Sequence, residues 1–254
     1  MKDNRKYVFL LIFLFCASAL AQSPDYAREK RWADEITPAI LVGDAVTLAQ
    51  DNGHKFLAIY AANPKARAGV IVVHGMGVHP DWNLINALRS QLSEQGYATL
   101  SVQMPVLAAD AKGESYPALF PDAAERLRVA VKFLRDKGHR KIAVVSHSMG
   151  ARMVNHFMAS GHDKGGASDI DAWASVGIST GVYVQAETFR SPVLDIYGEK
   201  DFPAVLANAA KRAEAIGRVR GSGQISVAGA DHYFTGAESE LTRHVKRWLD
   251  NVTR

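Results

Sequence analysis

The stretch Ile142-Ala143-Val144-Val145-Ser146-His147-Ser148-Met149-Gly150 joins an apolar run to the helix-compatible residues 151–159. A serine on such a strand-to-helix turn projects its hydroxyl away from the sheet, at a helix N-terminus that favours developing negative charge. The turn therefore predicts a nucleophilic Ser148, although the end of any buried strand could carry the same five residues. The pattern G-x-S-x-G has glycine where this chain has Ser146. Because that position needs only a small side chain, we expect Ser146→Gly to be tolerated.

On both sides of this turn, apolar strands alternate with amphipathic helices. Residues 45–50 and 55–61 flank Asp51-Asn52-Gly53, which is a strong hairpin signal. The alternation predicts a mostly parallel sheet with an antiparallel N-terminal edge hairpin and helices on both faces. Apolar runs typical of buried strands lie at 68–73, 173–178 and 193–197, and further strands are predicted at 98–102, 141–145 and 224–228. Helical patterns cover 26–36, 82–95, 205–216, 241–249 and a segment that opens on Asp122-Ala123-Ala124-Glu125, which resembles a capping box.

The first residues differ in kind from the rest of the chain. A basic segment with Lys2, Arg5 and Lys6 precedes an almost wholly apolar run, and Ala19-Leu20-Ala21 presents small residues where a signal peptidase reads. This pattern predicts a signal peptide over residues 1–21 and one domain over residues 22–254. The apolar run, roughly 15 residues, is short for a membrane span, which needs about 20. We therefore expect an exported protein, periplasmic or secreted, with no stable membrane anchor after cleavage.

Composition and residue spacing argue against nucleic acid as a partner and against a bound metal. Of the 254 residues, 48% are hydrophobic and 22% charged, which suits a globular domain with a sizeable core. Cleavage would remove the one cysteine, Cys16, together with three basic residues and one acidic residue, so the formal charge falls from +4 to +2. With no basic cluster interleaved with aromatic residues, nucleic acid is not an expected partner. The histidines lack metal-ligand spacing, so we expect no metal and no other cofactor.

A serine nucleophile needs a base, an acid that orients the base, and donors for an oxyanion. In a parallel sheet these groups should follow the carboxyl ends of strands. His232 follows the last predicted strand and is the candidate base, and Asp201 follows the strand at 193–197 and is the candidate acid. Glu199 competes for the role of the acid, and Asp231 is a more distant alternative. The order serine, acid, base is that of one known architecture.

The oxyanion donors are expected to be two backbone amides. The amide of Met149 directly follows the nucleophile. The loop His74-Gly75-Met76-Gly77 follows the strand at 68–73, and its glycines let the backbone approach a ligand closely, so Met76 is the second candidate donor. We expect His74 to make structural hydrogen bonds.

Taken together, the His-Gly loop, the serine turn, the Gly-x-x-Asp turn and the Asp-His loop resemble the α/β-hydrolase family, over roughly residues 45–251. The stretches 74–82 and 101–105 are similar to a poorly characterised group of exported bacterial α/β-hydrolases. The resemblance implies the α/β-hydrolase fold and hydrolysis through an acyl-enzyme. It also implies Ser148 as nucleophile, His232 as base, Asp201 as orienting acid, and the Met76 and Met149 amides as oxyanion donors.

Two segments, residues 79–82 and 106–121, could shape the mouth of the pocket. The first contains the candidate lining residues His79 and Trp82, and the second contains Tyr116 and Phe120. These rings could equally pack beneath their loops. Only about 14 residues separate the strand at 173–178 from the next, too few for a lid domain. We therefore expect a small or medium ester as substrate. Peptide, thioester or acyl-transfer chemistry on the same triad, or a non-catalytic envelope binding protein, remain alternatives, and the oligomeric state is open.

Overall fold

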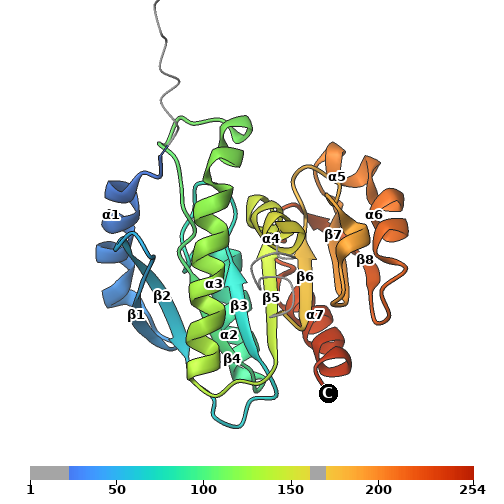
Figure 1. Ribbon diagram of the computed structural model, residues 1–254. Helices are drawn as coiled ribbons and strands as arrows, with labels where there is room; N and C mark the ends of the chain where they lie inside the picture. The colour runs from blue at the N-terminus through green and yellow to red at the C-terminus, as the bar shows by residue number, and fades with distance from the viewer. Residues whose placement is uncertain (1–22, 161–169) are drawn as a thin grey trace, which may run out of the picture.

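The computed structural model describes residues 23–160 and 170–254, so the signal peptide predicted at residues 1–21 lies outside the described residues. Within these ranges eight strands form one sheet in the order β1-β2-β4-β3-β5-β6-β7-β8 (Figure 1). The strands are β1 (Asp44–Ala49), β2 (Lys55–Ala61), β3 (Gly69–Val73), β4 (Ala98–Val102), β5 (Ile142–His147), β6 (Ala172–Val176), β7 (Val193–Lys200) and β8 (Gly223–Asp231).

The sheet is parallel except at one edge. β1 pairs antiparallel with β2, and β2 pairs antiparallel with β4, whereas all other neighbours are parallel. The β1–β2 hairpin turns at Gly53, whose φ of +84° is readily available to glycine. The predicted mostly parallel sheet with an antiparallel N-terminal edge hairpin is confirmed.

Helices cover both faces of the sheet. α3 and α4 pack together on one face, α2 and α7 pack together on the other, and α1 lies beside the β1–β2 hairpin (Figure 1). The α-helices are α1 (Tyr26–Ile36), α2 (Asn83–Glu94), α3 (Phe120–Asp136), α4 (Met149–Ser160), α5 (Pro203–Ala207), α6 (Ala209–Ile216) and α7 (Glu238–Val252). Single turns of 3-10 helix form η1 (Thr37–Ala39) and η3 (Ala186–Thr188), and a longer one forms η2 (Gly113–Leu119).

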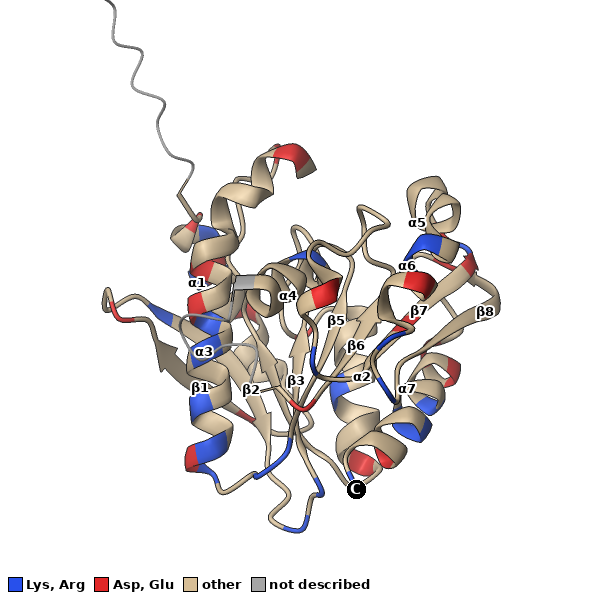
Figure 2. Ribbon diagram, turned by 45° about the vertical axis from the view of Figure 1, so that its right-hand side comes forward, with Lys and Arg blue, Asp and Glu red and all other residues tan. Residues whose placement is uncertain are grey.

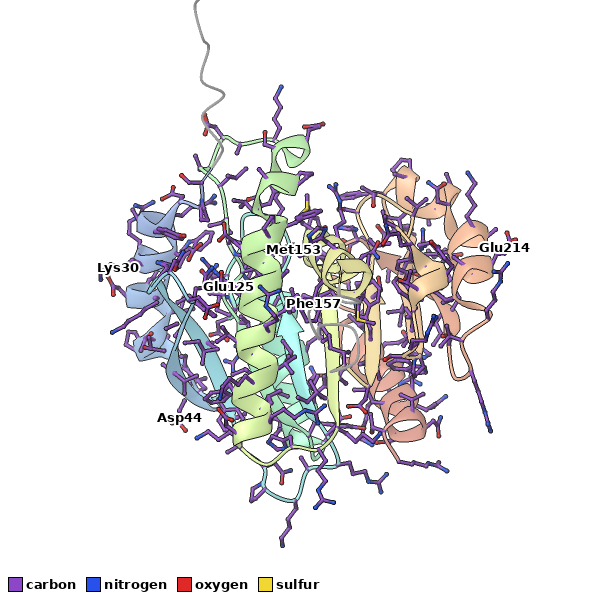
Figure 3. All side chains as sticks on the ribbon, viewed as in Figure 1. Lys30, Asp44, Glu125, Met153, Phe157 and Glu214 are labelled. Atoms are coloured by element: carbon purple, nitrogen blue, oxygen red, sulfur yellow. The ribbon has the colours of Figure 1, made fainter. Side chains whose placement is uncertain are left out.

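Each face of the sheet has its own hydrophobic core. Along β3, Ile71 and Val73 pack with α3 and α4, whereas the alternating Val70 and Val72 pack with α2 and α7. This period of two explains why the central strands read as continuous apolar runs. Figure 3 shows Met153 and Phe157 of α4 beside α3, and both side chains are buried in the first of these cores.

The segment Asp122-Ala123-Ala124-Glu125 does not cap a helix, contrary to the sequence-based expectation. α3 already begins at Phe120, with Pro121 in its first turn, where a missing N–H costs no intrahelical bond. The carboxylates at 122 and 125 instead accept hydrogen bonds from the hairpin turn: Gln50 Nε2 donates to both, and the amide of Asp51 donates to Glu125. These bonds join α3 to the edge of the sheet.

The helix predicted at 205–216 is two helices. α5 ends at Ala207 and α6 begins at Ala209, with Asn208 between them. The Asn208 amide donates to the Ala204 carbonyl (2.9 Å), and an asparagine that bonds to the local backbone competes with a continuous helix. On the outside of the molecule, acidic and basic residues are interspersed along α1, α3 and α7 (Figure 2).

Candidate active site

Ser148 lies on the sharp turn between β5 and α4. Its backbone is left-handed, with a φ of +56°, a conformation that residues with a Cβ rarely adopt. The Ser148 amide donates to the Val176 carbonyl at the end of β6 (2.9 Å), which fixes the turn against the neighbouring strand. Because β5 ends at His147 and α4 begins at Met149, Ser148 stands at the carboxyl edge of the sheet.

Gly150 allows α4 to approach β3 closely. A Cβ at this position would lie 2.3 Å from the His74 carbonyl oxygen and 3.0 Å from that of Val73, so the first turn of α4 rests on backbone. This contact holds the helix N-terminus next to the loop that follows β3.

Ser148, His232 and Asp201 form one line of hydrogen bonds. His232 directly follows β8, and its Nε2 lies 2.9 Å from Ser148 Oγ. Its Nδ1 lies 2.6 Å from Asp201 Oδ1, and Asp201 directly follows β7. His232 and Asp201 are buried, whereas Ser148 is half-buried and lines a cavity. With Nδ1–H donating to the carboxylate, Nε2 is free to take a proton from the serine.

The two competing carboxylates face other partners. Glu199 Oε2 accepts from the Gly229 amide (2.8 Å) on β8. Asp231 Oδ1 accepts from the amides of Tyr233 and Thr235, both at 3.0 Å, which closes the turn after β8. Of the three, Asp201 is the one that contacts the imidazole of His232.

The loop after β3 passes beside the serine. A Cβ on Gly75 would lie 3.3 Å from the Cβ of Ser148, which shows how closely the backbone approaches. Met76 and Met149 both line the cavity at Ser148. Met149 is the first residue of α4, so its amide has no acceptor within the helix. The two residues whose amides are the candidate oxyanion donors thus line the same cavity as Ser148.

His74 anchors this loop, as expected from the sequence. It is buried, its Nδ1–H donates to the Gly75 carbonyl (2.8 Å), and its Nε2 accepts from the Met104 amide (2.9 Å). Burial lowers the pKa of His74 from 6.5 to about 3, so the ring is neutral.

His147 holds the backbone of His232, a contact that the sequence did not reveal. Its Nε2–H donates to the His232 carbonyl (2.9 Å), and its buried Nδ1 has no partner in the described part of the chain. Burial, followed by the nearby His232, lowers the pKa of His147 from 6.5 to about 4. The two residues are 85 positions apart, and no local pattern signals such a pairing.

Ser146 also has a specific partner. Its buried Oγ accepts from the indole N–H of Trp173 on β6 (2.7 Å). The expectation that Ser146→Gly is tolerated did not include this hydrogen bond, and glycine would leave the buried Trp173 donor without an acceptor.

The cavity in front of Ser148 has a volume of about 510 Å³. Trp82 lines it, as predicted, and packs edge-on against Tyr233 at 5.9 Å between ring centroids. The Phe202 ring stacks on the His232 imidazole at 3.9 Å and covers its outer face. The lining residues are Gly75, Met76, Val78, Trp82, Gly113, Glu114, Pro117, His147, Ser148, Met149, Arg152, Ser179, Thr180, Phe202, His232 and Tyr233.

Three predicted lining residues lie elsewhere. Tyr116 is buried in the core on the α3 and α4 side, where its hydroxyl meets the backbone of Leu107 and Gly77. His79 packs against Trp32 of α1 at 5.7 Å between ring centroids. Phe120 lines a neighbouring cavity of about 360 Å³. None of these three aromatic side chains therefore lines the cavity at Ser148.

Other parts of the described chain show no comparable site. A larger hollow of about 900 Å³ between α1 and the β1–β2 hairpin contains no serine–histidine–carboxylate arrangement. Within residues 23–160 and 170–254, no group of three or more His, Cys, Asp or Glu side chains is placed to hold a metal ion. No helix in those ranges has the length and apolarity needed to cross a membrane.

Sequence comparison gives little information about function. The family described as "Protein of unknown function (DUF3530)" matches residues 9–123, a range that ends before Ser148. No curated protein matches the chain significantly.

Structural comparison defines the class of fold. Est1E from Butyrivibrio proteoclasticus is similar with a TM-score of 0.62 at 16% identity, over 82% of this chain and 98% of that one. A dienelactone hydrolase from Anabaena variabilis gives 0.65 at 20% identity, over 83% and 97%. An α/β serine hydrolase without a lid from Xanthomonas campestris gives 0.64 at 14% identity, over 84% and 95%. The chain therefore has the α/β-hydrolase fold.

Proposed function

We propose that this protein is a serine hydrolase that cleaves carboxylic esters of small or medium size. The observation that carries the proposal is the line of hydrogen bonds from Asp201 through His232 to Ser148, with Ser148 on a strained turn. Strain of this kind persists where the surrounding structure holds it for function. The esterases and hydrolases with the same fold support the same class of reaction.

The reaction follows from the placement of these atoms. Ser148 Oγ attacks the ester carbonyl carbon as its proton passes to His232 Nε2, and Asp201 stabilises the imidazolium that forms. The tetrahedral intermediate collapses when the C–O bond to the alcohol breaks and His232 protonates the departing oxygen. Water then attacks the acyl-enzyme with His232 again acting as base, which releases the acid and restores Ser148.

The oxyanion of each tetrahedral intermediate would be held by the amides of Met149 and Met76. The N-terminus of α4 adds a favourable field at this point, because helix N-termini carry partial positive charge. A cavity of about 510 Å³ suits a small-molecule ester. The connection between β6 and β7 carries only the short η3, which supports an arrangement without a lid.

A fluorophosphonate probe tests the nucleophile directly. We expect the wild type to be labelled, and Ser148→Ala and His232→Ala to be folded but unlabelled. A series of p-nitrophenyl esters of graded chain length then tests the substrate class, with the highest kcat/KM expected for short and medium acyl chains. Folded wild type that resists the probe would refute the proposal, and activity that rises sharply on long-chain emulsions would refute the size class.

Export is part of the same proposal. It rests on the sequence of residues 1–21, and its test is the N-terminal residue of the protein recovered from a bacterial host that expresses the full chain. We expect processing after Ala21 and recovery outside the cytoplasm. An intact N-terminus in the cytoplasmic fraction would contradict it.

A further inference from the structure

Arg152 is a cation at the active-site cavity, and no residue that the structure describes pairs with it as a charged partner. It lies on α4, four residues after Ser148 in the sequence, and both residues line the same cavity. The described part of the chain offers its guanidinium no carboxylate: Nη1 contacts the Met149 sulfur (3.6 Å), and the group lies over the Phe120 ring at 5.4 Å. A guanidinium has five N–H donors, and among the described residues the Met149 sulfur is the acceptor that it contacts.

This position is half-buried, and burial lowers the pKa of Arg152. A desolvated cation is stabilised by an anion, and a planar guanidinium can bind a carboxylate through two parallel hydrogen bonds. The other charged side chain on the cavity wall is Glu114 on η2, which is exposed and does not pair with Arg152. The guanidinium therefore remains available to a ligand.

Arg152 also connects two cavities. It lines the cavity at Ser148 and the neighbouring one of about 360 Å³, and Thr180 is shared in the same way. Of the seven large hydrophobic side chains exposed in the described chain, five line these two cavities: Met76, Phe202 and Tyr233 the first, Val182 and Val184 the second. The two cavities that share Arg152 thus also present exposed apolar side chains, which suit the hydrocarbon part of an amphipathic ligand.

We propose that the substrates are esters that also carry a carboxylate, held by Arg152 while Ser148 attacks the ester carbonyl. This inference rests on the proposed function and narrows its substrate class. It gives Arg152 a role in specificity, whereas the serine, histidine and aspartate perform the chemistry. The carboxylate could belong to the acyl part or to the alcohol part of the ester, and the two arms of the test distinguish these sources.

The acyl arm compares mono-p-nitrophenyl adipate with p-nitrophenyl hexanoate, and the alcohol arm compares para-acetoxybenzoate with para-acetoxybenzamide. The measured quantity is the ratio of kcat/KM for the anionic ester to that for its neutral match. In one of the arms we expect this ratio to be about tenfold lower in Arg152→Gln than in the wild type, with Arg152→Lys in between. The wild-type ratio should also fall as salt concentration rises.

Arg128→Gln is the matched control, because Arg128 is exposed on α3 and does not line either cavity. Its ratios should equal those of the wild type. If Arg152→Gln does not fold, competitive inhibition of the wild type replaces it, with hexanoate expected to inhibit at least about tenfold better than hexanamide.

The outcomes separate the two proposals. If the wild type cleaves the neutral esters but both ratios are the same in wild type, Arg152→Gln and Arg128→Gln, the inference about anionic substrates is overturned and the esterase proposal stands. Equal inhibition by hexanoate and hexanamide would overturn it in the same way. Failure of the wild type to cleave any ester or to react with fluorophosphonate would overturn the proposed function itself.

Discussion

Asp201 and Glu199 are two residues apart, but only Asp201 reaches the imidazole of His232, at 2.6 Å. An asparagine at 201 would still contact the ring but would favour the wrong tautomer and could not stabilise the imidazolium. We expect Asp201→Asn to lower kcat for ester hydrolysis by about three to four orders of magnitude. Glu199→Gln is the control and should keep near wild-type kcat. The reverse pattern in steady-state kinetics would transfer the role of the acid to Glu199.

The hydrogen bond between Ser146 and Trp173 leads to a second prediction at this scale. Ser146→Gly removes the acceptor of a buried indole N–H, so we expect the free energy of unfolding to fall by about 1–3 kcal/mol. Urea unfolding measures this loss. In a Trp173→Phe background the same change should cost clearly less, because the donor is gone. Equal losses in both backgrounds would show that the hydrogen bond contributes nothing.

Single residues differ in how far the sequence reveals them. Ser148, Asp201 and His232 could be proposed because each follows an apolar strand, and parallel strands bring their carboxyl ends to one edge. Nothing local marks His147 as the partner of the His232 carbonyl, or Arg152 as a cation that lines the cavity. Such roles depend on which side chains come into contact after folding. A contact between residues 85 positions apart produces no periodic pattern in the sequence.

At the scale of elements, strands were predicted better than helix ends. Every strand of the sheet overlaps a predicted segment. The strands β3, β4, β5 and β6 are buried along their whole length, and such burial favours continuous apolar sequences. The start of α3 was misplaced because Asp122 and Glu125 bind the hairpin turn instead of their own helix. The loop after β6, which supplies Ser179 and Thr180 to the cavity wall, is held by a residue far along the chain. Arg212 of α6 pairs with Asp195 of β7 and donates a hydrogen bond to the Gly181 carbonyl in this loop (2.9 Å).

The contact of α4 with β3 gives a prediction at the same scale. A methyl group at position 150 would overlap the His74 carbonyl oxygen, so Gly150→Ala must push α4 away from the loop that holds Met76. We expect a loss of about 1–3 kcal/mol in the free energy of unfolding, together with a lower kcat. Gly223→Ala is the control, because a Cβ there has open space and should change stability by at most about 0.5 kcal/mol. Similar unfolding curves for the two variants would contradict the proposed packing.

At the scale of the whole molecule, the sheet brings together loops that are far apart in the sequence. The loops after β3, β5, β7 and β8 all open at one edge, and they supply Met76, Ser148, Asp201 and His232 respectively. Two buried neutral histidines support this edge: His74 joins the loop after β3 to Met104, and His147 joins β5 to the loop after β8. The integrity of the site and the stability of the fold are therefore linked through the protonation of these two rings.

This link predicts acid sensitivity with a defined sign. The pKa of His147 is lowered from 6.5 to about 4 and that of His74 to about 3, so the unfolded chain binds these protons at a higher pH than the folded chain does. The stability that these neutral rings contribute is thus present above pH 6.5, and it is lost as the pH falls toward about 4 for His147 and about 3 for His74. Each ring should lower the free energy of unfolding by about 2 kcal/mol between about pH 7 and about pH 5. Urea unfolding across this range measures the slope, and His147→Asn, which cannot titrate, should show a shallower one. An unchanged slope in that variant would mean that His147 is not a buried neutral support of the site.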